Sequence, residues 1–307
     1  MKVFITGSTG LIGQAIVEAL RQRGDEVTVL TRSAAKAKAI WPEGVEIVEG
    51  DPCYQGEWQS QIAGQDAVIN LAGEALNNER WTARFRQRLH DSRIDTTRLV
   101  VETLVALPSS QRPKTLLSAS GIDYYGFSEI DLFDEDAVDE STVGGESFLA
   151  GLCWDWEDET TPCEEVGVRV VLMRTGLVLA KSGALSRLAK PFRYFLGGRI
   201  GGGKQWVSWI HIDDVARAYL HALDTQIAGA VNLVSPGNVR NRDFAATLGR
   251  VLGKPLWFPV PKFVLRAATG QISEYILKGR NAVPTALLQS GFQFRFPQLG
   301  PALEDLL

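Results

Sequence analysis

The chain has 307 residues, of which 45% are hydrophobic, and this is enough apolar material for one large domain or two moderate ones. A formal net charge of −4 argues against a protein that binds nucleic acid or another polyanion, although it does not exclude local basic patches. No apolar run has the length of a membrane span, and the chain opens directly on an expected strand, so we expect neither a membrane segment nor a signal peptide.

Residues 3–13 combine a strand, a glycine turn and the start of a helix. Gly7 allows the tight turn, Gly10 leaves room for a pyrophosphate, and Gly13 lets the helix pack closely on the strand. Free N–H groups and the helix dipole then favour phosphates at this turn. The motif predicts a dinucleotide site, and the alternative is a tight turn that binds nothing. The predicted cofactor contacts here are Gly7, Ser8, Thr9, Gly10, Leu11, Ile12 and Gly13.

Apolar segments and helical patterns alternate through the first half of the chain. Strands are expected at residues 27–31, 45–48, 67–71, 115–119 and 168–173. Helices are expected at 14–22, ended by Gly24, at 34–40 with Ser33 as N-cap, and at 82–107, stopped by Pro108. This alternation predicts an α/β fold with a parallel, doubly wound sheet of the Rossmann type.

The pattern changes after Arg174. The expected elements are a helix at 183–196 interrupted by Pro191, a glycine-rich segment at 197–203, a strand at 206–210, a helix through 223 capped by Asp213, a strand at 231–234, and mostly helix from 241 onward. We therefore expect a nucleotide-binding Rossmann domain at 1–175, to which 206–234 crosses back. Residues 176–205 and 235–307 then form a smaller, mostly helical substrate lobe.

The end of the second strand indicates which cofactor is preferred. Dinucleotide folds that bind NAD place an acidic residue there to hold the ribose 2′-hydroxyl. This chain has Thr31, Arg32 and Ser33 instead, and its carboxylates, Asp25 and Glu26, come before the strand. A guanidinium pairs with a 2′-phosphate, so these three residues favour NADP(H) over NAD. The alternative is a solvated arginine at the start of a helix.

Two weaker features concern the substrate and the thiols. The glycines of 197–203, with Arg199 and Lys204, either admit an anionic substrate or form a turn between a helix and a strand. The three cysteines are odd in number and lack the spacing of metal ligands. They predict free thiols in a reducing cytoplasm, with no metal site.

The chain resembles the extended short-chain dehydrogenase/reductase superfamily, and within it the atypical group called epimerase family proteins. The matching segments are Ile5–Gly13, Asn70–Gly73, Ser92–Ile94, Ser118–Ser120, Tyr124–Gly126, Leu172–Gly176 and Trp209–Asp214, with a C-terminal helical segment from about Pro255. The resemblance covers nearly the whole chain. It implies a Rossmann core, an NADP-type cofactor and a substrate lobe formed by the C-terminal third.

The resemblance also implies roles for individual residues. Asn70, Leu71, Ala72 and Gly73 would lie beside the cofactor ribose, Asp51 would approach the adenine, and Arg93 and Ser118 belong to the same cofactor site. Ser120 matches the serine that hydrogen-bonds a substrate oxygen in this superfamily. The alternative for Ser120 is a strand-end serine bonded to backbone.

The chain departs from the superfamily at the acid/base pair, because no tyrosine is followed four positions later by lysine. In the superfamily that lysine lowers the tyrosine pKa, and the tyrosine transfers a proton during hydride transfer. Phe148 and Leu152 are expected at the two positions here. Tyr125, ahead of Tyr124, is the candidate replacement, and the alternative for both tyrosines is aromatic packing.

Two functions therefore stay open. The first is an NADP(H)-binding oxidoreductase or epimerase-like enzyme that acts on a small polar substrate between the lobes. The second is a weakly catalytic or non-catalytic protein that senses NADP(H) or acts through a partner, with a link to cell division suggested only by a label that some relatives carry. Neither involves nucleic acid or a membrane, and the sequence leaves a homodimer open.

Overall fold

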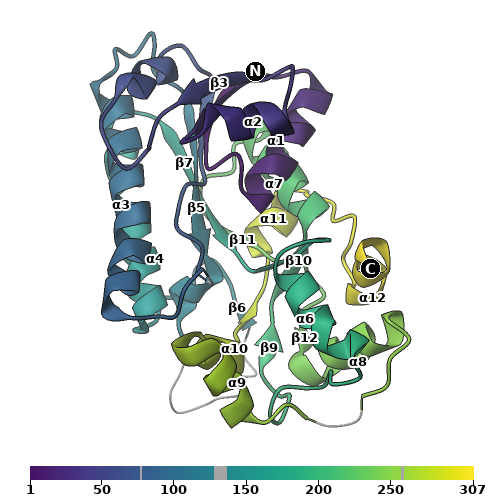
Figure 1. The fold of residues 1–307 in the computed structure, drawn as a ribbon. Coiled ribbons are helices and arrows are strands. Elements are labelled where there is room, and N and C mark those ends of the chain that lie inside the picture. The colour runs from purple at the N-terminus through teal and green to yellow at the C-terminus, as the bar shows by residue number, and fades with distance from the viewer. Residues whose placement is uncertain (77, 128–136, 257–258) are drawn as a thin grey trace.

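A seven-stranded parallel sheet forms the centre of the computed structural model, which describes residues 1–76, 78–127, 137–256 and 259–307 (Figure 1). The strand order is β11-β7-β5-β4-β1-β2-β3. These strands are β1 (Lys2–Thr6), β2 (Glu26–Thr31), β3 (Glu46–Glu49), β4 (Ala67–Asn70), β5 (Thr115–Gly121), β7 (Arg169–Thr175) and β11 (Gly229–Leu233). The chain winds outward from β1 to β3 and then outward again from β4 to β11, so the topological switch lies between β1 and β4. The predicted doubly wound Rossmann sheet is confirmed.

Helices cover both faces of the sheet (Figure 1). One face carries α1 (Leu11–Arg23), α2 (Ala34–Ile40), α7 (Ile212–Asp224) and α11 (Thr285–Gln289); the other carries α3 (Ala83–Ala106), α4 (Phe148–Asp158), α5 (Thr161–Glu165) and the 3-10 turn η1 (Glu57–Ile62). Val3 and Ile5 pack toward α1, whereas Phe4 packs toward α3. Because both faces are buried, the central strands are almost continuously apolar.

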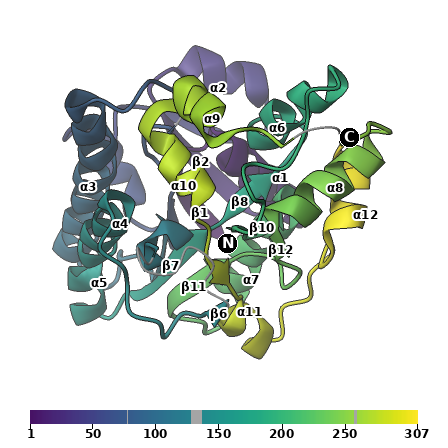
Figure 2. The same ribbon diagram turned by 90° about the horizontal axis from the view of Figure 1, so that it is seen from below.

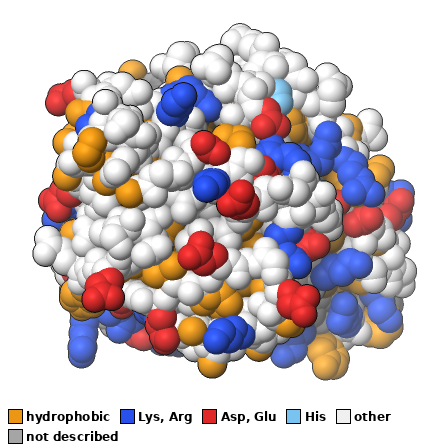
Figure 3. Space-filling view, turned by 90° about the horizontal axis from the view of Figure 1, so that it is seen from above, with side chains coloured by type: hydrophobic (Ala, Val, Ile, Leu, Met, Phe, Trp, Pro, Cys, Tyr) orange, Lys and Arg blue, Asp and Glu red, His pale blue; other side chains and the backbone are white. Residues whose placement is uncertain are grey.

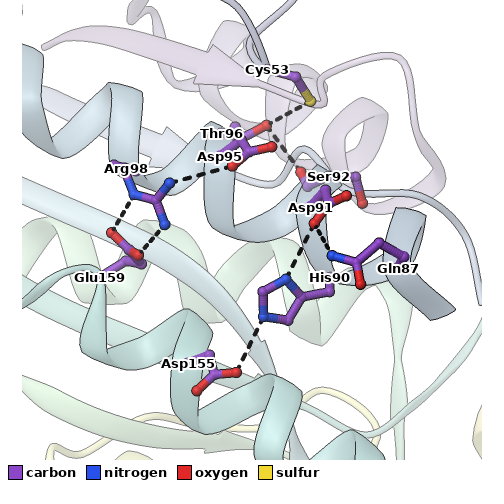
Figure 4. A network of polar contacts seen from close by, with 10 residues as sticks. All are labelled: Cys53, Gln87, His90, Asp91, Ser92, Asp95, Thr96, Arg98, Asp155 and Glu159. Atoms are coloured by element: carbon purple, nitrogen blue, oxygen red, sulfur yellow. Dashed lines mark hydrogen bonds and ion pairs between the residues drawn. The ribbon is translucent and has the colours of Figure 1, made fainter.

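Helix ends in the first half follow the predicted signals. The Ser33 hydroxyl caps α2 by accepting a hydrogen bond from Lys36 N at 3.3 Å, and Gly24 ends α1 with a φ of 88°. On the surface, α3 and α4 are joined by the pairs Arg98–Glu159 at 2.7 Å and His90–Asp155 at 3.2 Å (Figure 4).

The expected strand at 206–210 is wrong as a single element. It consists of β9 (Trp206–Val207), antiparallel to β12 (Val239–Arg240), and β10 (Trp209–His211), parallel to β8 (Leu177–Leu179). The break falls at Ser208, whose hydroxyl donates to Arg280 O at 2.7 Å and accepts from Ala282 N at 3.1 Å. Ser208 therefore ties the chain to the C-terminal segment between two pairings with different strands.

The expected cap of α7 is also corrected. His211, not Asp213, is the N-cap, since its Nδ1 accepts a hydrogen bond from Asp213 N at 3.1 Å. Asp213 therefore lies inside the first turn, where its own N–H needs a partner. Asp213 and Asp214 instead tie down the C-terminal tail: Asp213 pairs with the Arg295 side chain at 2.9 Å, and Asp214 accepts from Phe296 N at 2.9 Å.

The C-terminal part is mostly helical. It contains α6 (Ala184–Arg193), α8 (Asn241–Val251), α9 (Lys262–Thr269), η3 (Gly270–Ile272), α10 (Ser273–Leu277), β13 (Asn281–Ala282) and α12 (Leu299–Leu306). The helix expected at 183–196 is shorter, and it ends two residues after Pro191. Viewed from below, α9 and α10 lie between α3–α4 and α6–α8 (Figure 2).

This C-terminal part is joined to the Rossmann core at several places. β13 pairs in parallel with β6 (Ala137–Val138). Phe292 is buried in the core that holds α1 and α7, and Phe296 is buried with α8 and α12. We expect the aromatic residues of this apolar C-terminal segment to be buried, and two others of them, Trp257 and Phe258, lie outside the described residues.

The distribution of charged side chains on the surface and the state of the cysteines agree with the expectations from the sequence. Acidic and basic side chains are interspersed on the face seen from above (Figure 3). Cys53, Cys153 and Cys163 are all free thiols. Within the described part of the chain, no helix combines the length and the apolarity needed to cross a membrane.

Candidate functional site

The glycine turn between β1 and α1 has the predicted close approaches. A Cβ on Gly7, whose φ is 66°, would lie 2.6 Å from the backbone carbon of Leu71, and a Cβ on Gly13 would lie 2.5 Å from Gly7 O. Gly7 therefore lets the turn contact the end of β4, and Gly13 lets α1 pack on the turn. A Cβ on Gly10 would approach only Gly7 O, at 3.3 Å.

The space beside this turn fits an anionic group. Gly10 is the N-cap of α1, whose first N–H groups have no partner within the helix. The Ser8 hydroxyl is buried without a hydrogen-bond partner among the described residues, and so is the Ser118 hydroxyl at β5. Buried hydroxyls in that state are expected to bind a ligand or water. The turn and the Ser8 hydroxyl thus fit the pyrophosphate side of a dinucleotide, while the predicted contact of Ser118 with the cofactor stays a prediction.

Arg32 follows β2 and is exposed, with no ion pair among the described residues. Ser33 next to it caps α2, and the Ser33 backbone N–H donates to Thr31 Oγ1 at 3.2 Å. Asp51 lies past the end of β3 and accepts a hydrogen bond from Cys53 N at 3.0 Å. The carboxyl ends of β2 and β3 therefore place a free guanidinium and a carboxylate on the same edge of the sheet as the glycine turn.

The turn after β4 is held from both sides. Asn70 Oδ1 accepts from Thr6 Oγ1 at 2.6 Å and its amide donates to Thr97 Oγ1 at 2.9 Å, so this side chain ties β1 to α3. Gly73 lies against Arg93, because a Cβ there would be 3.3 Å from Arg93 Cγ. Arg93 donates to Leu89 O and to Glu74 O, at 2.9 Å and 3.0 Å. Burial lowers the pKa of Arg93.

Ser120, at the end of β5, belongs to a buried ionic network. Its hydroxyl donates to Glu157 Oε1 at 2.6 Å, and not to backbone as one alternative had it. Glu157, from α4, accepts two hydrogen bonds from Arg174 of β7, at 2.8 Å from Nε and 2.7 Å from Nη2. Three elements are thereby locked together by one carboxylate. The predicted contact of Ser120 with a substrate stays a prediction.

Tyr125 is also part of this network. Its hydroxyl donates to Asn232 Oδ1 at 2.8 Å and accepts from Arg174 Nη1 at 3.1 Å. Burial raises the pKa of Tyr125 to about 12. The Tyr124 ring lies over the Arg174 guanidinium, 3.4 Å from its central carbon, and stacks on Trp154. Both tyrosines thus have the packing contacts of the structural alternative, while a catalytic role for Tyr125 stays a prediction.

Helix α4 begins at Phe148, and Leu152 is buried one turn later. Both pack in a cluster with Trp81, which lies just before α3, and with Tyr275 of α10. Within the described chain this helix therefore presents an apolar surface where the superfamily resemblance places a tyrosine and a lysine.

The glycine-rich segment at 197–204 is a packed turn. Ile200 N donates to Asn241 Oδ1 at 2.7 Å, Gly201 N to Val260 O at 2.9 Å, and Gly203 N to Ile200 O at 3.0 Å. These N–H groups already donate to oxygens of the protein. The segment therefore fits the predicted turn between a helix and a strand better than a binding site for an anionic substrate.

Three residues of this region were missed by sequence reasoning: Asp123, Glu157 and Arg174. Arg174 stood in a matching motif but received no role, and Glu157 lies five residues beyond Leu152 on the same helix. Asp123 lies between Ser120 and Tyr125, in the 3-10 turn η2 (Ile122–Tyr125). An acidic residue directly after a sheet strand was the signal that could have identified it.

Comparisons with known proteins cover the whole chain. Residues 3–233 match the NAD dependent epimerase/dehydratase family, and residues 260–306 match a domain of unknown function, DUF1731. The chain is 40% identical over 305 residues to Epimerase family protein ML0860 of Mycobacterium leprae, covering 98% of this chain and 94% of that protein. It is 36% identical over 313 residues to the Epimerase family protein SDR39U1 homolog, chloroplastic, of Arabidopsis thaliana, covering 100% and 87%.

A solved structure supports the same relationship. The human epimerase family protein SDR39U1 (isoform 2), crystallised with NADPH, aligns with a TM-score of 0.84 and 33% identity. The alignment covers 100% of this chain and 99% of that chain.

Proposed function

Because the chain belongs to the NAD dependent epimerase/dehydratase family, we propose that it binds NADPH and acts as an oxidoreductase or epimerase-like enzyme on a small polar substrate. The observation that carries this proposal is the glycine turn at the start of α1, where Gly10 is the N-cap and the buried Ser8 hydroxyl has no hydrogen-bond partner among the described residues. The NADPH of the human relative agrees with the cofactor predicted from Arg32.

The chain's own residues would hold the cofactor along the carboxyl edge of the sheet. The Gly7–Gly13 turn would bind the pyrophosphate, and Arg32 with Ser33 the 2′-phosphate. The Asn70–Gly73 turn would border the ribose, and Asp51 the adenine. Bound NADPH supplies a hydride. Ser120 would accept a hydrogen bond from a substrate hydroxyl, because its own hydrogen is donated to Glu157 at 2.6 Å.

The apolar start of α4 predicts low activity on ordinary sugar-nucleotide and ketone substrates. A positioned acid typically contributes roughly 10²–10⁴-fold to such a step, and neither Phe148 nor Leu152 can move a proton. The double variant Phe148→Tyr with Leu152→Lys, assayed beside the parent and Ser120→Ala on a reductase substrate panel, tests this. Parent turnover at rates usual for the superfamily, unaffected by Ser120→Ala, would contradict both the low activity and the role of Ser120.

The same apolar helix start favours the second candidate, a protein that senses NADP(H) or acts through a partner. Fluorescence of NADPH distinguishes the two. A titration measures binding, and incubation with mixed metabolites follows oxidation of the dihydronicotinamide. Turnover supports the enzyme, and binding without turnover supports the sensor. A parent protein that does not bind NADPH in the titration would refute both.

A further inference from the structure

We propose that the Asp123 carboxyl is the acid that gives a proton to the substrate oxygen, in place of the missing tyrosine and lysine. This proposal rests on the proposed function and names a residue for it. The first support is position: Asp123 follows β5, whose neighbour in the sheet is β4, followed by β1. Ligands of open α/β sheets bind at the carboxyl ends of the strands near the topological switch.

Contacts connect Asp123 to the glycine turn. The Asp123 carboxylate interacts electrostatically with Arg93, and Arg93 lies against Gly73 at the end of β4. The adjoining backbone of Leu71 touches Gly7 of the first turn. The carboxyl ends of β5, β4 and β1 thus form one continuous edge, with Asp123 on the side away from Arg32.

The second support is that Asp123 is unengaged. Ser120 donates to Glu157, and the Tyr125 hydroxyl is bonded to both Asn232 and Arg174. The Asp123 carboxylate, in contrast, has no hydrogen bond or ion pair within the described ranges of the chain. The hydroxyls of Ser120 and Tyr125 are therefore engaged by the fold, whereas no hydrogen bond engages the Asp123 carboxylate among the described residues. Asp123 is only partly buried, so its carboxyl can reach a ligand, and a titratable group at the ligand-binding edge of the sheet that the fold does not use points to a functional role.

The surroundings favour the protonated form of Asp123. A Cβ on Gly121 would lie 3.6 Å from Asp123 Oδ2 and 3.6 Å from the Cys153 sulfur, so the carboxyl and the thiol share one small space. Burial raises the pKa of Asp123 to about 6, against the lowering effect of the Arg93 charge. The titratable and charged groups that face it or pack on its turn are Arg93 of α3, Cys153 and Glu157 of α4, Arg174 of β7 and Tyr275 of α10.

The proton balance of the step is simple. When a carbonyl carbon accepts the hydride that bound NADPH supplies, its oxygen takes the proton from the Asp123 carboxyl, and an alcohol forms. Asp123 is left as a carboxylate whose charge the nearby Arg93 guanidinium offsets. Water then returns a proton to Asp123, and the reverse sequence serves oxidation. A group with a pKa near the working pH can act in both directions.

The first test measures Asp123 without any substrate. Infrared spectra of the full chain, recorded from pH 4 to pH 8, should show a protonated carboxyl that titrates near pH 6 and is lost in Asp123→Asn. Saturating NADPH should move this midpoint to higher pH, because the cofactor excludes water and adds negative phosphates. A midpoint that is absent from the parent, or that NADPH leaves unchanged, overturns the proposal.

Stability provides a second readout. A carboxyl whose pKa is raised in the folded chain binds its proton more tightly there than in the unfolded chain, so it lowers stability as the pH rises from about 4 to about 6. Asp123→Asn should remove this decline and leave the variant no less stable than the parent at pH 7. A variant that instead loses stability at pH 7 would show a structural role and overturn the proposal.

Kinetics complete the test, with aromatic aldehydes and α-diketones as probe carbonyls. Asp123→Asn should lower kcat by roughly 10²–10⁴-fold with the Kd for NADPH unchanged, while Asp123→Glu restores part of kcat. Asp155→Asn on the outer side of α4 is the matched control. Equal turnover by the parent and Asp123→Asn overturns only the role of Asp123, whereas a parent that binds no NADPH or oxidises none of it overturns the proposed function as well.

Discussion

The buried pair of Glu157 and Arg174 should be the most sensitive point of the site scaffold. Glu157 is 8% exposed and Arg174 is 4% exposed, and the carboxylate accepts hydrogen bonds from Arg174 Nε, Arg174 Nη2 and Ser120 Oγ. In Glu157→Gln the NH₂ group of the new glutamine side chain would face the hydrogen-bond donors of Arg174 or Ser120. The positive charge of Arg174 would then stay buried without a counterion. Removing one partner of a buried ion pair costs about 3–5 kcal/mol, and we expect this loss in the free energy of unfolding.

Urea titration of the parent and the variant measures this loss. Glu159→Gln is the matched control, because it removes the surface partner of Arg98 near the end of the same helix, where a pair contributes about 0–1 kcal/mol. Replacing both buried partners, by Glu157→Leu with Arg174→Met, should recover part of the loss, since no unpaired charge remains. If Glu157→Gln costs no more than Glu159→Gln, the network does not hold the end of β5 as argued.

Three further outcomes are expected. Gly10→Val should weaken NADPH binding in a fluorescence titration, because the side chain would occupy the space expected for the pyrophosphate; an unchanged Kd would place the site elsewhere. Arg32→Ala should lose about tenfold or more in affinity for NADPH, because it removes a charge-assisted hydrogen bond of roughly 1.5–3 kcal/mol, and it should lose little affinity for NADH. The exposed Lys38→Ala is the control, and equal losses for the two cofactors would mean that Arg32 does not bind the 2′-phosphate. Truncation after Lys254 should give an insoluble or unfolded chain by circular dichroism and gel filtration, because it exposes the core around Phe292 and Phe296; a truncated chain as well folded as the parent would contradict this.

Local sequence determined the Rossmann half. The close packing at Gly13 and the caps at Ser33 and Gly24 act through contacts or backbone conformations a few residues apart, although Gly7 also touches the distant Leu71. Their physical causes are therefore visible in a short window of sequence. The absence of a tyrosine with a lysine four positions later is likewise a property of sequence alone.

Tertiary structure decided what the polar residues of the site contact. Glu157 meets Ser120 across 37 positions of chain and Arg174 across 17, and Tyr125 meets Asn232 across 107. The cap of α7 and the break at Ser208 also depended on partners far along the chain, in the tail around Arg295 and at Arg280. An acidic or hydroxyl side chain looks the same in sequence whether it is paired or unpaired. Only the folded arrangement shows that Ser120 is engaged and that Asp123 is partly buried with no hydrogen bond to its carboxylate among the described residues, because burial and pairing are set by neighbours from other elements.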